Sequence, residues 1–290
     1  MGALAAIDAA WAAHIHLDFI ADPRDFLILG LRLSITFALR AFAVRHCGLM
    51  AEYFALTLAA STTICALSYL CLASTGPLVD ARLMAMDRTL GFDWLAGYQF
   101  VHAHPALAAL LGLAYGSLVY QGLYLGLLLG LLDAKQRLRE MFWLFLLAGL
   151  LACAGAMLFP ALGPSKFYNI QIDNGFVLVM QHLLSGRDLH FSLSGMTGVV
   201  SFPSFHTAMA LAYCWAFRKT GIISAAIMSL KMIMLCAVPF FGGHYLVDIV
   251  AGAATMLMAL ALLKTAPLFG RKTIAASASP ESAAASGGAY

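Results

Sequence analysis

Long apolar stretches recur along the chain, separated by short polar turns and by two longer segments of mixed composition. A helix that crosses the roughly 30 Å hydrocarbon core of a bilayer needs about 20 mostly apolar residues. The stretches that approach this requirement lie at residues 50–73, 106–132, 140–159, 204–219, 221–241 and 244–263. The pattern therefore predicts an all-α integral membrane protein, built as a six-transmembrane-helix bundle.

A further apolar stretch, residues 26–45, precedes the predicted bundle. It contains Arg32 and Arg40, so the sequence leaves open whether it crosses the bilayer or lies along its surface. We expect a tail rich in Ala, Ser and Gly to be disordered. The predicted parts are an N-terminal segment with the extra helix, the six-helix membrane domain and the cytoplasmic tail, at 1–49, 50–265 and 266–290.

The composition excludes a soluble protein. Hydrophobic residues make up 62% of the 290 positions and charged residues only 11%, whereas charged residues make up about 25% of typical soluble domains. The formal net charge of +3 is too small to indicate nucleic-acid binding.

Basic residues gather in three places: the turn at 133–139, the turn at 218–220 and the segment after the last predicted span. With six alternating crossings these places share one membrane face, and the longer segments 74–105 and 160–203 share the other. The positive-inside rule makes the basic face, with the C-terminus, cytoplasmic. We expect segment 74–105 to form short helices at the opposite surface rather than another crossing.

Two histidines lie at the starts of predicted spans. His206 ends the sequence Ser201-Phe-Pro-Ser-Phe-His, in which Pro203 and Ser204 suit a helix start. His244 follows two glycines, and the chain crosses the membrane twice between the histidines, so both return to one face. Asp248 follows His244 by four residues, one helical turn, where side chains meet.

This spacing favours phosphoryl transfer. A carboxylate one turn from an imidazole fixes its tautomer and prepares it as a nucleophile. A second histidine serves as general acid and then as general base, and the amides of two helix N-termini attract phosphate. We expect His206, His244 and Asp248 to be catalytic, with the site facing the periplasm of a bacterial inner membrane.

Three other functions remain open from these residues. Two histidines and one carboxylate also match the ligand set of a non-haem iron site, although no carboxylate cluster and no His-x-His pair lies next to these residues in the sequence. We expect no metal and no cofactor. A transporter would favour inverted repeats and broken helices, which the sequence does not show, and a structural membrane protein would use the histidines for stability alone.

The histidine motifs resemble those of the type 2 phosphatidic acid phosphatase superfamily. Its second motif, PSGH, is matched by Pro203-Ser-Phe-His206, with Phe in place of Gly. Its third motif, SRxxxxxHxxxD, is matched at His244 and Asp248, whereas Ala237 and Val238 replace the Ser and Arg. The first motif, KxxxxxxRP, is absent, and the sequence FPALGPSK stands in its place at 159–166.

The sequences FPALGP, FPSFH and GGHYLVDIVAG together resemble the inositol phosphorylceramide synthase branch, the aureobasidin-resistance type. Sphingomyelin synthases are more distant relatives. The resemblance implies a metal-independent transferase: His244 attacks a lipid phosphodiester, Asp248 orients it, and His206 protonates the leaving alkoxide and then activates an acceptor. A phosphatase of the same fold, acting on phosphatidic acid or an isoprenyl diphosphate, is the alternative.

The resemblance implies membrane lipids as partners: a phospholipid donor, with phosphoinositol as a candidate head group, and a ceramide-like or diacylglycerol-like acceptor. Phosphate or head-group contacts are expected from the loop facing the site and from two helices. Loop cations also meet lipid head groups without any specific role, and a mid-span lysine lines a lipid cavity, pairs with an acid or snorkels to the interface. The candidates are Lys166, Tyr168, Asn169, Arg187, Ser204 and Lys231.

Overall fold

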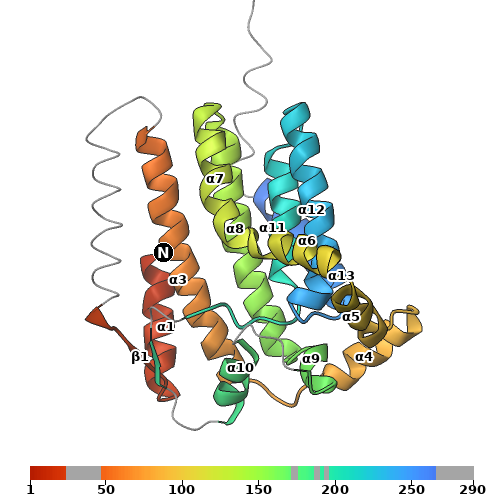
Figure 1. The fold of residues 1–290 in the computed structure, drawn as a ribbon. Helices are drawn as coiled ribbons and strands as arrows, with labels where there is room; N and C mark the ends of the chain where they lie inside the picture. Colours follow the sequence, from red (N-terminus) through yellow and green to blue (C-terminus); the bar gives the residue numbers. More distant parts are fainter. Residues whose placement is uncertain (24–46, 171–175, 186–189, 193–195, 266–290) are drawn as a thin grey trace, which may run out of the picture.

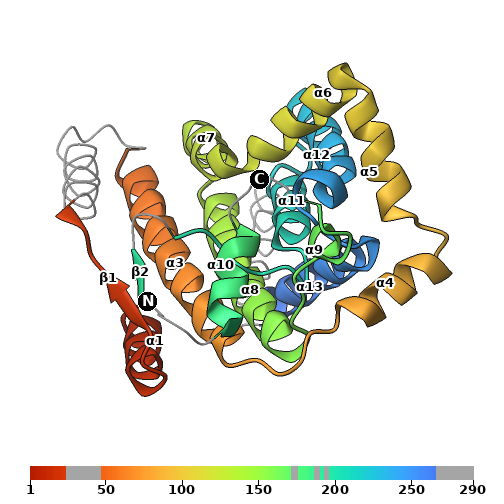
Figure 2. The same cartoon turned by 60° about the horizontal axis from the view of Figure 1, so that its bottom comes forward.

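The computed structural model describes residues 1–23, 47–170, 176–185, 190–192 and 196–265. This part of the chain is predominantly helical, as predicted. Two three-residue strands, β1 (Asp18–Ile20) and β2 (His190–Ser192), pair in parallel beside helix α1 (Gly2–His14) (Figure 2). The predicted extra helix and the predicted tail lie outside the described residues.

Among the described residues, four helices are long and apolar enough to cross a bilayer, by length and composition. They are α3 (Cys47–Ala73), α8 (Lys135–Leu158), α12 (Ile222–Phe241) and α13 (Leu246–Thr265). The predicted span at 106–132 is instead a bent pair, α6 (Pro105–Gly116) and α7 (Leu118–Leu131), with an angle of 61° between its two parts. The break falls at Gly116-Ser117, a residue pair at which helices commonly kink. If the pair counts as one span, the described residues hold five.

Helix α11 (Phe205–Ala216) is shorter than the predicted span at 204–219. Its 12 residues extend roughly 18 Å at 1.5 Å per residue, less than the hydrocarbon core requires, so six crossings stay a prediction. It lies between α8, α12 and α13 (Figure 2). Small side chains allow this close packing: the fully buried alanines of α11 are Ala208, Ala210, Ala212 and Ala216.

The segment 74–105 forms two short helices, as predicted, α4 (Asp80–Thr89) and α5 (Trp94–Ala103). Two further short helices, α9 (Pro164–Phe167) and α10 (Phe176–Ser185), follow α8. In Figure 1, α4, α9 and α10 lie at the lower end of the long helices. The structure thus places parts of both long connecting segments at one end of the bundle.

The basic turns meet at the other end of the bundle. Arg218, after α11, forms a 2.9 Å ion pair with Glu140, which follows the 133–139 turn. The guanidinium of Arg218 and the amine of Lys264, in the last turn of α13, lie 4.1 Å and 4.9 Å from the centroid of the Trp215 ring. The described basic residues of the three segments therefore lie at one end of the bundle, and the membrane face to which they belong stays a prediction.

Candidate active site

The start of α11 is tied directly to α13. Ser204 caps α11, since its Oγ accepts a 3.3 Å hydrogen bond from the Thr207 backbone N–H. The Ser204 N–H in turn donates to the backbone carbonyl of Asp248 at 3.0 Å. Gly252 permits this approach, because a Cβ there would collide with the Ser204 carbonyl oxygen. His206, two residues past the cap, is thereby fixed relative to α13.

His244 lies in the short loop between α12 and α13, directly after Gly243, whose φ of 64° suits glycine. Its Nδ1 lies 3.2 Å from Oδ2 of Asp248, and the same oxygen accepts a 2.9 Å hydrogen bond from the Tyr245 N–H. Asp248 is 0% exposed and His244 only 3% exposed. The predicted contact between these two side chains is present.

The two histidines lie side by side, although His206 belongs to α11 and His244 to the loop before α13. Their ring centroids are 6.1 Å apart, and the ring planes meet edge to face at 61°. Tyr115, near the end of α6, stacks on His206 with centroids 4.6 Å apart and planes 15° apart. Nothing in the sequence singles out Tyr115, because it lies among apolar residues with no motif around it.

The electrostatics of the pair suit a nucleophilic imidazole. Burial holds the pKa of His244 well below its usual value, at about 4, and the Ser201 backbone offsets this only in part. His244 is therefore neutral at pH 7. When the ionised carboxylate of Asp248 accepts a hydrogen bond from the Nδ1–H of His244, the opposite ring nitrogen, Nε2, carries no proton and keeps its lone pair.

The N-terminus of α13 is already occupied by carboxylates. Asp87 of α4, fully buried, accepts hydrogen bonds from the backbone N–H groups of Leu246 (2.8 Å) and Val247 (3.0 Å), and Asp248 takes that of Tyr245. The expectation that this helix end offers free amides to a phosphate is wrong for these three groups. A buried helix N-terminus needs such acceptors, and side chains of the same protein supply them here.

A second acidic residue of α4 joins two loops at the site. Asp80 accepts hydrogen bonds from the N–H groups of Leu162 (3.0 Å) and Gly163 (2.8 Å) and from the hydroxyl of Tyr245 (3.0 Å). Sequence reasoning missed both Asp80 and Asp87. Their seven-residue spacing, which places them on one helix face, was the available signal.

The predicted loop residues lie in and after α9. Lys166 and Asn169 are exposed, and Asn169 has a left-handed φ of 53°. Tyr168 stacks on Trp94 with centroids 5.8 Å apart, and its hydroxyl lies 3.6 Å from the sulfur of Met84. Arg187 lies outside the described residues.

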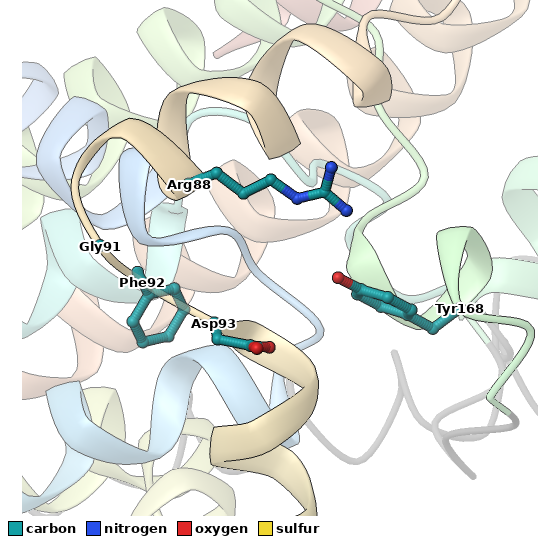
Figure 3. A pocket seen from close by; sticks show the side chains of 5 residues that line it. All are labelled: Arg88, Gly91, Phe92, Asp93 and Tyr168. Carbon is teal, nitrogen blue, oxygen red and sulfur yellow. The ribbon is translucent and has the colours of Figure 1, made fainter.

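Tyr168 also lines a pocket of about 270 Å³ that the sequence did not predict. The guanidinium of Arg88 points toward Tyr168 across this pocket, and the Asp93 carboxylate lies nearby (Figure 3). Arg88 adjoins Asp87, whose carboxylate accepts a hydrogen bond from the Leu246 N–H at the start of α13.

The other two candidates are buried within the bundle. Ser204 is engaged as the cap of α11, and the Thr207 hydroxyl also donates to it at 3.2 Å. Lys231 is 1% exposed, and its amine lies 4.5 Å from the centroid of the Tyr213 ring. Lys231 lies about three helical turns before the end of α12, because Phe241 is ten residues further on. It is therefore not brought to the histidines.

No three His, Cys, Asp or Glu side chains in the described part of the chain lie close enough to share a metal ion. His206, His244 and Asp248 therefore do not form the iron-type ligand set that their composition permits. Instead, the imidazole of His244, which contacts Asp248, lies next to the imidazole of His206.

Comparison with known protein families matches residues 81–262 to the PAP2 superfamily. The match covers more than half of the chain and extends from α4 to the last turns of α13. The chain belongs to the PAP2 superfamily. Searches of curated proteins and of solved structures gave no match. Membership indicates lipid phosphate chemistry of the phosphatase or phosphotransferase type, and the motif histidines of the resemblance are the two that the fold brings together.

Proposed function

We propose that the protein is a metal-independent lipid phosphotransferase that moves a phospho-head group between lipids through a phosphohistidine at His244. One observation carries the proposal: a neutral, carboxylate-oriented imidazole lies edge to face with a second imidazole, with ring centroids 6.1 Å apart. This is the arrangement of a nucleophile with its orienting group and an adjacent acid–base group.

In the first step, Nε2 of His244 attacks the phosphorus, and the bond from phosphorus to the leaving lipid oxygen breaks. His206, which enters this step as the imidazolium, donates its proton to that oxygen and becomes neutral, while Asp248 stabilises the positive charge on the phosphorylated imidazole. In the second step, His206 removes the proton from an acceptor hydroxyl, whose oxygen attacks phosphorus and releases His244.

The acceptor distinguishes the two candidate activities. An alcohol such as ceramide or diacylglycerol makes the protein a transferase, and water makes it a phosphatase. The near-complete burial of His244 and Asp248 supports the transferase, because an apolar site that excludes water limits hydrolysis of a reactive intermediate. The FPSFH and GGHYLVD sequences support phosphoinositol as a head group to test first.

We further propose that α11 completes six crossings and that the basic end of the bundle faces the cytoplasm. The histidines would then face the periplasm of a bacterial inner membrane, where lipid head groups of the outer leaflet are accessible. The ion pair of Arg218 with Glu140 supports a common side for the basic turns, and the positive-inside rule assigns that side.

The test uses purified protein in mixed micelles that contain a phosphoinositol lipid, with and without ceramide or diacylglycerol. Mass spectrometry identifies the products. We expect a new phospho-head-group lipid that requires both the acceptor and His244, and none from His244→Ala. Full activity of His244→Ala would falsify the phosphohistidine mechanism. Release of a water-soluble head group regardless of acceptor would establish the hydrolase.

The same assay tests the expected independence from metal. Activity in excess EDTA should equal activity without it, because the proposed nucleophile and acid are both imidazoles. Loss of activity that added divalent metal restores would contradict the mechanism.

A further inference from the structure

Helix α4 contacts the loop of His244 through the carboxylates of Asp87, which is buried, and Asp80, which is half-buried. The proposed chemistry needs a fixed geometry in this loop. Asp87 lies two turns after Asp80, so both side chains project from the same face of α4. We propose that Asp80 and Asp87 are positioning residues, which hold the start of α13 so that His244 faces His206 at the distance that phosphoryl transfer requires. This inference rests on the proposed function.

The contacts of Asp87 act on the residues next to His244. Its two carboxylate oxygens accept one backbone N–H each, from Leu246 at 2.8 Å and from Val247 at 3.0 Å. Two bonds from one rigid carboxylate fix both the position and the direction of the first turn of α13. Because His244 precedes that turn and Asp248 belongs to it, a shift of the turn would move the nucleophile and its orienting group together.

Asp80 holds the neighbouring backbone on the other side of the loop. Its carboxylate accepts hydrogen bonds from the Tyr245 hydroxyl at 3.0 Å and from the backbone N–H groups of Leu162 and Gly163. Gly163 has a φ of 92° and lies so close to Gly243 that a Cβ would collide with the Gly243 carbonyl oxygen. Asp80 therefore fixes the backbone against which the residue before His244 packs.

A small apolar cluster makes this connection rigid. Leu83 and Met84 of α4 pack with Ala161, Tyr245 and Val247 in a core separate from the main bundle. The cluster faces the same loop as the two carboxylates. Burial of these side chains excludes water from the hydrogen bonds of Asp87, and this strengthens those bonds.

Burial also has a consequence for the charge of Asp87. Desolvation raises the pKa of its carboxyl, and the two N–H donors counter the shift in part. Replacement by Asn keeps the shape but sets an amide N–H₂ against one of the two backbone donors. Replacement by Ala leaves both donors without acceptors. The two variants therefore give graded losses of the same contact.

The experiment measures kcat and KM for Asp87→Asn, Asp87→Ala and the control Asp133→Asn. The control changes a carboxylate in the turn before α8 whose side chain is half exposed, at the basic end of the bundle. We expect kcat to fall about tenfold for Asp87→Asn and about 100-fold for Asp87→Ala, with KM changed less than about threefold, since a small misplacement of reacting groups acts on kcat. Asp133→Asn should match the wild type.

A coupling measurement separates positioning from a general structural role. Asp248→Asn retains some activity from the remaining groups, and Asp87→Asn is then added to it. If Asp87 acts through the His244–Asp248 pair, the second change lowers kcat less than about threefold in this background, because residues that act as a unit are not additive. The full tenfold loss in both backgrounds overturns the proposal, as does wild-type kcat in Asp87→Asn.

Two further variants keep the test decisive. If Asp87→Asn does not accumulate in the membrane, Tyr245→Phe is assayed in its place. This change removes only the hydroxyl that donates a hydrogen bond to Asp80. It should lower kcat several-fold, and an unchanged kcat overturns the role of α4. His244→Ala is assayed in parallel: if it stays active, the proposed function fails, whereas an inactive His244→Ala with a fully active Asp87→Asn overturns the positioning role alone.

Discussion

The backbone N–H of Ser204 donates to the backbone carbonyl of Asp248 at 3.0 Å. The first residue is the cap of the helix that carries His206, and the second is the carboxylate residue that orients His244. The two halves of the site are therefore joined by main-chain atoms. This close approach of the two backbones depends on Gly252, which has no side chain at the point of contact.

The contact at Gly252 leads to a prediction on helix packing. A Cβ there would lie 2.9 Å from Cβ of Thr207 and would collide with the Ser204 carbonyl oxygen. Gly252→Ala should therefore separate α11 from α13, destabilise the protein by about 1–3 kcal/mol and lower kcat. The measurements are thermal unfolding in detergent and kcat in the lipid assay.

Gly48→Ala is the matched control for this change. It also replaces a helical glycine, and a Cβ there has no neighbour within 4 Å. Alanine by itself favours helix by up to about 1 kcal/mol, so Gly48→Ala should be neutral or stabilising. Equal stability gains for both variants would show that α11 and α13 do not pack as described.

The low pKa of His244, about 4 because of burial, predicts the acid side of the pH profile. The nucleophile must be neutral, so protonation below that pKa removes activity. With a phosphodiester donor, kcat/KM should not fall between about pH 7 and about pH 5 and should fall in more acidic solution. In Asp248→Asn the acid fall should move to lower pH, since the carboxylate that stabilises the imidazolium is gone. A fall centred near pH 6.5 in the wild type would contradict a buried, neutral His244.

The separate roles of the two histidines predict a trapped intermediate. A nitrophenyl phosphodiester has a leaving group that needs no proton, so His206→Ala should still phosphorylate His244 while losing the base for the second step. The acid-labile phosphoprotein should accumulate and be detected by intact-protein mass spectrometry. The double variant His206→Ala with His244→Ala is the control and should stay unlabelled. Labelling of the double variant would place the nucleophile elsewhere.

The proposed orientation predicts the labelling of introduced cysteines. In a background without the six native cysteines, a cysteine at the exposed position Asn169 should react with an impermeant thiol reagent in intact cells. A cysteine at Asp133, also exposed, should react only after permeabilisation. The reverse pattern would overturn the assignment of the basic end to the cytoplasm.

The sequence determined the elements whose signal lies in neighbouring residues. Apolar length predicted α3, α8, α12 and α13, because a helix in lipid must satisfy its own backbone and expose apolar side chains. Four-residue spacing predicted the contact of His244 with Asp248, and the contact forms although His244 lies in the loop two residues before α13 begins. Counting the predicted crossings led to the expectation that His206 lies beside His244, and their ring centroids are 6.1 Å apart.

Tertiary structure decided what depends on how the helices pack. No local pattern shows that Tyr115 stacks on His206 or that Asp87 fills the amides of α13, because these contacts join segments far apart in the chain. The apolar runs likewise did not predict the bend between α6 and α7 or the short length of α11. Hydropathy records which residues avoid water, whereas the shapes of neighbouring helices determine which of them meet.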